Sequence, residues 1–209
     1  MRLFRERFAI FAFIGLSLIF SGCKKKDLTY TVSGTIHDVT FNNSLEGAQV
    51  KIYSSGSADD NFSTTITTGA DGTYSYTFPR RNYTDITIEV SKGNYFGSKK
   101  TFILDDLSVN EGNTFNFDLE TKAWVKLHFL ADGVKDVKFG RIEGYGGCDE
   151  CCDGTEQVIT DCTDYEYLCL NKGNKVYKIY YSVIGSSENG IVEVTTVPFE
   201  YTELLVDLQ

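Results

Sequence analysis

The sequence contains little proline, methionine, tryptophan or histidine, with two, one, one and two copies among its 209 residues. It has no Pro/Gly/Ser-rich linker and no internal repeat. After residue 22, no stretch carries the long apolar stripe of 3.6-residue period that is typical of an amphipathic helix. Basic side chains number 20 against 29 acidic ones, for a formal net charge of −9. Nucleic-acid binders need a basic footprint, so we expect no nucleic-acid partner.

The first residues have the anatomy of an export signal. Three arginines (Arg2, Arg5 and Arg7) precede an apolar run over residues 8–20, and the small pair Ser21-Gly22 follows. As a helix, this run rises only about 20 Å, well short of the roughly 30 Å hydrocarbon core of a bilayer. The pattern therefore favours a cleaved signal peptide over a membrane span.

The residues Ser21-Gly22-Cys23 resemble the lipobox of bacterial lipoproteins, with Phe20 in the slot that usually holds leucine. The resemblance implies cleavage after residue 22 and a diacylglyceryl group on Cys23, the first residue of the mature chain. Two or more acyl chains anchor a protein stably. We expect a signal peptide at 1–22, a lipid tether at 23–27, and a location in the cell envelope at the outer membrane. The covalent lipid is the only prosthetic group expected. The alternative is an ordinary signal peptide with a chance cysteine.

The rest of the chain is rich in the residues that strands prefer. Tyr and Phe number 13 and 15, and threonine and valine are frequent, a composition that suits pleated, half-buried strands. Between residues 28 and 120, apolar residues alternate with polar ones, and Asp71-Gly72 marks a hairpin turn. We predict an all-β fold whose first part is a seven-stranded β-sandwich. The predicted strands cover residues 30–36, 48–53, 63–68, 73–78, 86–90, 100–104 and 114–119.

Four segments of this first part resemble the carboxypeptidase regulatory-like domain. They are residues 32–36 (VSGTI), 45–52 (LEGAQVKI), 68–74 (TGADGTY), and Val90 with Gly93-Asn94-Tyr95. The resemblance implies a transthyretin-like (prealbumin-like) sandwich over residues 28–120 that is not itself catalytic. In that family the domain is a spacer or interaction module attached to peptidases, receptors and surface lipoproteins.

Residues 121–209 continue the alternation. We predict a second β-sandwich there, immunoglobulin-like in a loose sense, with turns at Asp132-Gly133, 171–174 and 185–190. An alternative, in which this part extends the first sheet as one domain, stays open. The predicted strands cover residues 125–129, 137–142, 157–160, 165–170, 177–183, 192–194 and 204–208.

The second part also contains a cysteine cluster: Cys148, Cys151, Cys152, Cys162 and Cys169. An exported chain meets an oxidising compartment, so we expect two disulfides and one free thiol, with fifteen possible pairings. A redox pair at Cys148 and Cys151 is disfavoured, because the neighbouring acids Asp149, Glu150 and Asp153 raise a thiol pKa. Zinc bound by four of the thiolates is a further alternative, although the spacing does not repeat that of zinc modules.

No catalytic group is predicted and no metal site is assigned. His37 and His128 are expected at a strand end and on a solvent-facing strand position, with no nucleophile beside them in the sequence. The sequence predicts a non-enzymatic envelope lipoprotein, an interaction or scaffold module with a protein or glycan partner. One alternative is a glycan-binding accessory of an outer-membrane uptake system, which requires exposed coplanar aromatic rings. The other is a thiol- or metal-binding protein that uses the cysteine cluster. Candidate sugar-binding aromatics are Trp124, Tyr145, Tyr165 and Tyr167.

Overall fold

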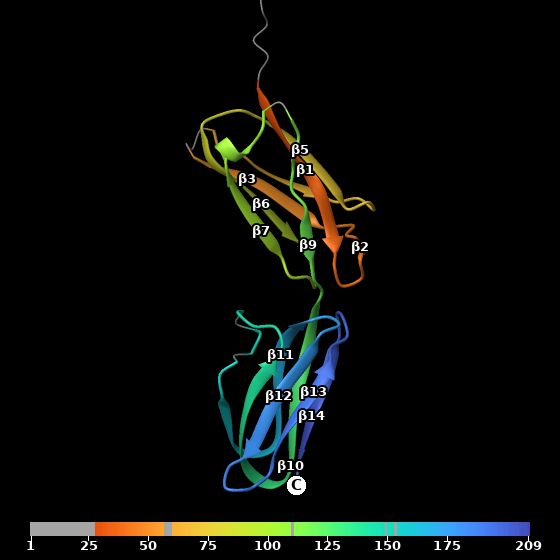
Figure 1. Cartoon of the computed structure of the whole chain (residues 1–209), viewed down its shortest axis with the longest axis vertical. Coiled ribbons are helices and arrows are strands. Elements are labelled where there is room, and N and C mark those ends of the chain that lie inside the picture. The colour runs from red at the N-terminus through yellow and green to blue at the C-terminus, as the bar shows by residue number, and fades with distance from the viewer. Residues whose placement is uncertain (1–27, 57–59, 110, 149, 153) are drawn as a thin grey trace, which may run out of the picture.

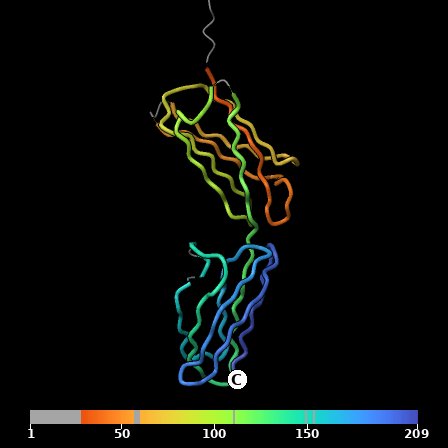
Figure 2. Tube along the Cα trace, viewed as in Figure 1, coloured from red at the N-terminus to blue at the C-terminus, as the bar shows by residue number. Residues whose placement is uncertain are grey.

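The computed structural model describes residues 28–56, 60–109, 111–148, 150–152 and 154–209. Apart from one short 3₁₀ turn, η1 (Leu104–Asp106), the regular secondary structure of these residues is all strand, so the predicted all-β fold class is confirmed. Within these ranges, no helix has the length and apolarity to cross a membrane. The predicted signal peptide and tether, including Cys23, lie outside the described residues. The chain forms two bodies end to end, and β1 starts at the tip opposite the C-terminus (Figures 1 and 2).

The first body holds two sheets. All seven predicted runs form strands, the last of them split into β8 and β9. In one sheet β1 lies between β2 and β5 and also pairs, in parallel, with β8 and β9. The other sheet has the order β4-β3-β6-β7. The strand bounds are β1 Thr29–Asp38, β2 Asn43–Ser44, β3 Gln49–Gly56, β4 Ser63–Thr67, β5 Thr73–Pro79, β6 Tyr83–Ser91, β7 Ser98–Ile103, β8 Asn113–Thr114 and β9 Phe117–Leu119.

The alternating pattern places one apolar face of each sheet inside. Val32, Ile36, Val50, Ile52 and Ile88 all have no exposed surface, and burial of each such side chain contributes about 1.5–3 kcal/mol. The glycine inside β1 also has a packing reason. A Cβ at residue 34 would overlap the carbonyl of residue 115, which closes directly over it between β8 and β9. The first body therefore has one continuous core.

The second body differs from the prediction in its first two strands. The bounds are β10 Lys122–Glu143, β11 Gln157–Lys172, β12 Val176–Val183, β13 Asn189–Thr195 and β14 Tyr201–Leu208. The chain does fold back around the expected Asp132-Gly133 position, but it does so within one continuous strand, β10, and not through a turn between two strands. Register shifts between Leu130 and Val137 form a bulge at which the strand folds back on itself, so that Glu143 lies again near Glu120 at the junction (Figure 1). Two predicted strands likewise merge into β11.

The bend lets one long hairpin contribute to both layers of the second body. The first part of β10 pairs with the end of β11 and, in parallel, with β14. The part after the bulge pairs with the start of β11 and with β12. Phe129 and Phe139, from the two parts of β10, pack with ring centroids 4.9 Å apart. This core is separate from that of the first body, and β10–β14 extend neither of the first body's sheets.

Candidate functional site

The junction between the two bodies is built around Thr121, which has no exposed surface. Its amide donates to Oγ1 of Thr40 at 3.0 Å, and its carbonyl accepts a 3.0 Å hydrogen bond from the amide of Gly173. It also forms an isolated bridge with Tyr95, and the Lys122 amide donates to the Asn94 carbonyl at 2.8 Å. The connecting segment is therefore hydrogen-bonded to loops of both bodies and is not a free linker.

Aromatic rings pack across one side of this junction. Phe199, from the segment before β14, lies 6.0 Å from Phe41 and 5.3 Å from Tyr95, measured between ring centroids. The hydroxyl of Tyr95 donates to Oδ2 of Asp38 at 2.8 Å. Burial raises the pKa of Tyr95 well above its ordinary value, and its hydrogen bond to Asp38 adds to the shift. Asp38 also accepts hydrogen bonds from the amides of residues 40 and 41, which fixes the loop that carries Phe41.

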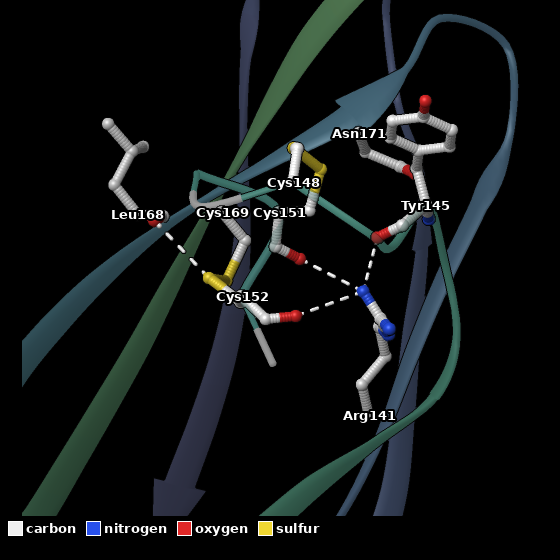
Figure 3. Close-up of a disulfide and its surroundings, with 8 residues drawn as sticks. All are labelled: Arg141, Tyr145, Cys148, Cys151, Cys152, Leu168, Cys169 and Asn171. Atoms are coloured by element: carbon white, nitrogen blue, oxygen red, sulfur yellow. Dashed lines mark hydrogen bonds between the residues drawn. A yellow bond between two sulfur atoms is a disulfide. The ribbon is translucent and has the colours of Figure 1, made fainter. Parts of the chain in front are cut away.

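The cysteine cluster lies on the opposite side and contains two disulfides, Cys148–Cys151 and Cys152–Cys169 (Figure 3). The fifth thiol, Cys162, is free and buried, so the expected two bridges and one thiol are present. With four of these five sulfurs in disulfides, a zinc site made of four thiolates has no basis here. Of the three acids expected around the thiols, Asp149 and Asp153 lie outside the described residues.

The guanidinium group of Arg141 on β10 is hydrogen-bonded to three backbone carbonyls of the disulfide loop. Nη1 donates to the carbonyls of Cys151 and Cys152 at 2.9 and 3.0 Å, and also to the carbonyl of Tyr145 (Figure 3). Three carbonyl dipoles around one cation explain how a polar loop can be ordered without regular strands. A side chain at Gly146 would overlap this guanidinium. Nothing near Arg141 in the sequence signals this role, because its partners are backbone groups.

The disulfide loop contacts the first body through Tyr145. Its ring lies 4.5 Å from that of Phe96, and its amide donates to Oδ1 of the buried Asn171 at 2.8 Å. The ammonium of Lys172 lies 4.6 Å from the Tyr145 ring and forms an ion pair with Glu120 at the junction. An open pocket of about 340 Å³ lies beside this contact. It is lined by Tyr95, Phe96, Gly97, Lys122, Cys148, Glu150 and Leu170.

Cys162 lies away from the loop, in the core of the second body. Its exposed fraction is 2%, and Sγ lies 3.9 Å from the Phe129 carbonyl oxygen. Burial raises the pKa of this thiol, and the charge of Asp164 adds to the shift. A buried thiol with a raised pKa is a poor nucleophile and a poor metal ligand at neutral pH.

The four candidate aromatics do not form one platform. Tyr145 packs in the junction, while Tyr165 and Tyr167 stack on each other, with Tyr167 packed against the core of the second body. Trp124 instead pairs with Tyr201 on the outer face of β10 and β14. Their ring planes lie within 23° of each other, with centroids 5.3 Å apart, and Tyr201 is 66% exposed. Tyr201 was missed, because only the parallel pairing of β14 with β10 brings it to Trp124.

Both histidines are paired with carboxylates. Nδ1 of His37 lies 3.7 Å from Asp118. His128 lies between Glu203, 2.7 Å from Nδ1, and Asp164, 2.9 Å from Nε2. These hydrogen bonds, that to Glu203 first, raise the pKa of His128.

Among the described residues, one group of side chains could hold a metal ion: His128, Glu166 and Glu203. Their ligand atoms all lie within 4.8 Å of one another. The ammonium of Lys126 already bridges the two glutamates, at 2.9 and 3.2 Å. The arrangement is therefore an ion-pair network that links β11, β10 and β14.

The sequence matches no protein-family model and no curated protein. Among solved structures, it is similar to the shaft pilin of Lactobacillus rhamnosus GG, at 10% identity over 87% of this chain and 98% of that one, with a TM-score of 0.36. A streptococcal ancillary pilin is 13% identical over 85% of this chain and 62% of that one, with a TM-score of 0.36. A mutant catechol 1,2-dioxygenase of Acinetobacter radioresistens is 17% identical over 45% of this chain and 52% of that one, with a TM-score of 0.34. Likenesses at this level assign no function to the chain.

Proposed function

We propose that this protein is a non-enzymatic, lipid-anchored module of the cell envelope that holds its second body away from the membrane for interaction with a partner. The observation that carries the proposal is the braced end-to-end arrangement of the two bodies. The described chain enters at one tip, crosses the junction once at Thr121 and ends at the opposite tip (Figure 1). An anchor on Cys23 would lie five residues before Leu28, at the entry tip. The first body would then be the spacer and the second the presented surface.

Two further elements belong to this proposal. The first body is proposed to be a carboxypeptidase regulatory-like, transthyretin-like sandwich, which is supported by strands at all seven expected positions. The absence of catalysis is also part of the proposal. It is supported by His128, both of whose ring nitrogens are hydrogen-bonded to carboxylates, by His37, whose Nδ1 faces Asp118, and by Cys162, which is buried.

Mass spectrometry of the N-terminal peptide from the membrane fraction tests the anchor. We expect a mature chain that begins at Cys23 and carries a diacylglyceryl thioether, in the outer-membrane fraction. The variant Cys23→Ala should keep its leader and carry no lipid, while Cys162→Ala, a matched control at another cysteine, should be processed and acylated normally. A native product that is unacylated and freely soluble would rule the proposal out.

A second candidate function, binding of a glycan, is favoured by the Trp124–Tyr201 pair. The stacked rings of exposed Tyr201 and half-buried Trp124 offer an apolar surface to the C–H face of a sugar, and the charged side chains of Lys126 and Glu203 lie in the next row of the same sheet face. Pull-down on envelope and plant polysaccharides compares the native chain with Tyr201→Ala. Tyr165→Ala is the control, since Tyr165 is also exposed but lies outside the pair. Equal retention of all three chains would remove this candidate.

A further inference from the structure

The two bodies share a feature of topology that the proposed function does not require. In each body, the strand through which the chain enters is hydrogen-bonded in parallel to the strand through which it leaves. In the first body, β1 pairs with β8 at two positions and with β9 at three. In the second, β10 pairs with β14 at eight positions, from Trp124 opposite Tyr201 to Ala131 opposite Leu208. Every other strand pair in the described sheets is antiparallel.

Parallel pairing decides how tension along the chain acts on these strands. When the two ends of the chain are pulled apart, β1 is pulled back toward its start and β9 forward past Leu119. The same holds for β10, pulled through Lys122, and β14, pulled through Leu208. The two strands of each pair are therefore sheared along their length, so the hydrogen bonds of the ladder break together. An antiparallel terminal pair with both loaded ends on one side would open one rung at a time.

We propose that both bodies are load-bearing, with β1/β8/β9 and β10/β14 as shear-loaded clamps in series between the anchor and the far tip. This inference rests on the proposed anchored role, because tension needs a fixed end. The proposed function requires only that the second body is held away from the membrane. The present inference adds that both bodies resist unfolding under tension. The junction belongs to the same load path, since Thr121 is hydrogen-bonded to both bodies.

The side chains of the β10/β14 pair strengthen its rungs on both faces. Inside, Leu204, Val206 and Leu208 are buried in the core of the second body. Outside, Glu203 on β14 bonds both His128 and Lys126 on β10, at 2.7 and 3.2 Å. Sliding β14 along β10 must expose the inner residues and break the outer ion pairs at once.

Single-molecule force spectroscopy tests the proposal on the unacylated mature chain. One handle is attached to Cys23 and the other to the C-terminus, so that both bodies are pulled in shear. In a second geometry the far handle is attached to a cysteine introduced as Glu200→Cys, at the junction end of β14. That geometry opens the β10/β14 pair from one end, while the first body stays in shear as an internal control. The two bodies are told apart by the length of chain that each releases.

We expect the second body to unfold at a several-fold higher force in the end-to-end geometry, with no change for the first body. Equal forces for the second body in the two geometries would overturn the proposal. As a variant, Thr202→Pro removes the amide that the parallel register directs at the carbonyl of Trp124, and Thr202→Ala keeps that amide. Only the proline variant should lower the force. Since the chain is unacylated, the outcome is independent of whether Cys23 carries lipid in the cell.

Discussion

The two disulfides should contribute unequally to stability, although they belong to one loop. A disulfide restricts the unfolded chain more when it closes a longer segment. Cys152–Cys169 has a sequence separation of 17, and Cys148–Cys151 a separation of 3. In the chain-entropy model, these lengths correspond to about 3 and about 1.5 kcal/mol of unfolding free energy at 25 °C. The paired variants Cys152→Ala/Cys169→Ala and Cys148→Ala/Cys151→Ala test the difference without leaving an unpaired partner.

The assay is urea unfolding followed by the fluorescence of Trp124. This is the only tryptophan of the chain and lies on β10, so its signal reports the second body. With an m-value of about 2 kcal/mol/M, the midpoint should fall by about 1.5 M for the longer bridge and about 0.75 M for the shorter one. Equal losses, or a larger loss for the shorter bridge, would show that the loop stabilises through its native contacts and not through loop closure.

Three further predictions concern single groups. Stability should fall above pH 10, because burial raises the pKa of Tyr177 to about 12 and the fold holds its neutral form. Urea unfolding at pH 8 and pH 11 should show a loss of about 1.4 kcal/mol from this residue at pH 11, which Tyr177→Phe lacks. In a chain that begins at Leu28, Ellman titration without reductant should find no fast thiol in the native state and one after unfolding, from Cys162. Finally, Phe199→Ala should broaden the interbody distances measured by small-angle scattering and leave the unfolding of each body nearly unchanged, whereas a narrow, unchanged distribution would show that the other junction contacts, at Thr121, Lys122 and Tyr145, are enough to fix it.

The alternation of apolar residues predicted the strands well, because a two-residue period depends on local sequence alone. It identified the inward faces around Val32, Val50 and Ile88 correctly. At Asp132-Gly133 the turn-forming residues located the place where the chain folds back, but not that the strand stays continuous through it. Whether such a pair ends a strand or lies within a folded one depends on the partner strand, and β11 stays paired with β10 on both sides of the fold.

The candidate site is formed by contacts between residues that are far apart in the sequence, and local sequence patterns do not predict such contacts. The cysteine count and the export signal predicted two bridges, but the pairing of Cys152 with Cys169 follows from how the loop returns over β11. Tyr201 could not be chosen as the neighbour of Trp124 before the parallel pairing of β14 was known. Arg141 and Thr121 act through backbone groups, for which no side-chain motif exists.

The buried junction residue has a consequence for how this protein can vary in length. Thr121 is followed by the strand whose residues Val125, Leu127 and Phe129 point inward. One residue inserted between Thr121 and Trp124 would move every later side chain to the opposite face, so that these three would meet water. Two residues would restore the faces but separate the hydrogen-bonded loops. Surface loops elsewhere can therefore gain or lose residues. This short segment must keep the same number of residues, because that number decides which face of the sheet each later side chain occupies.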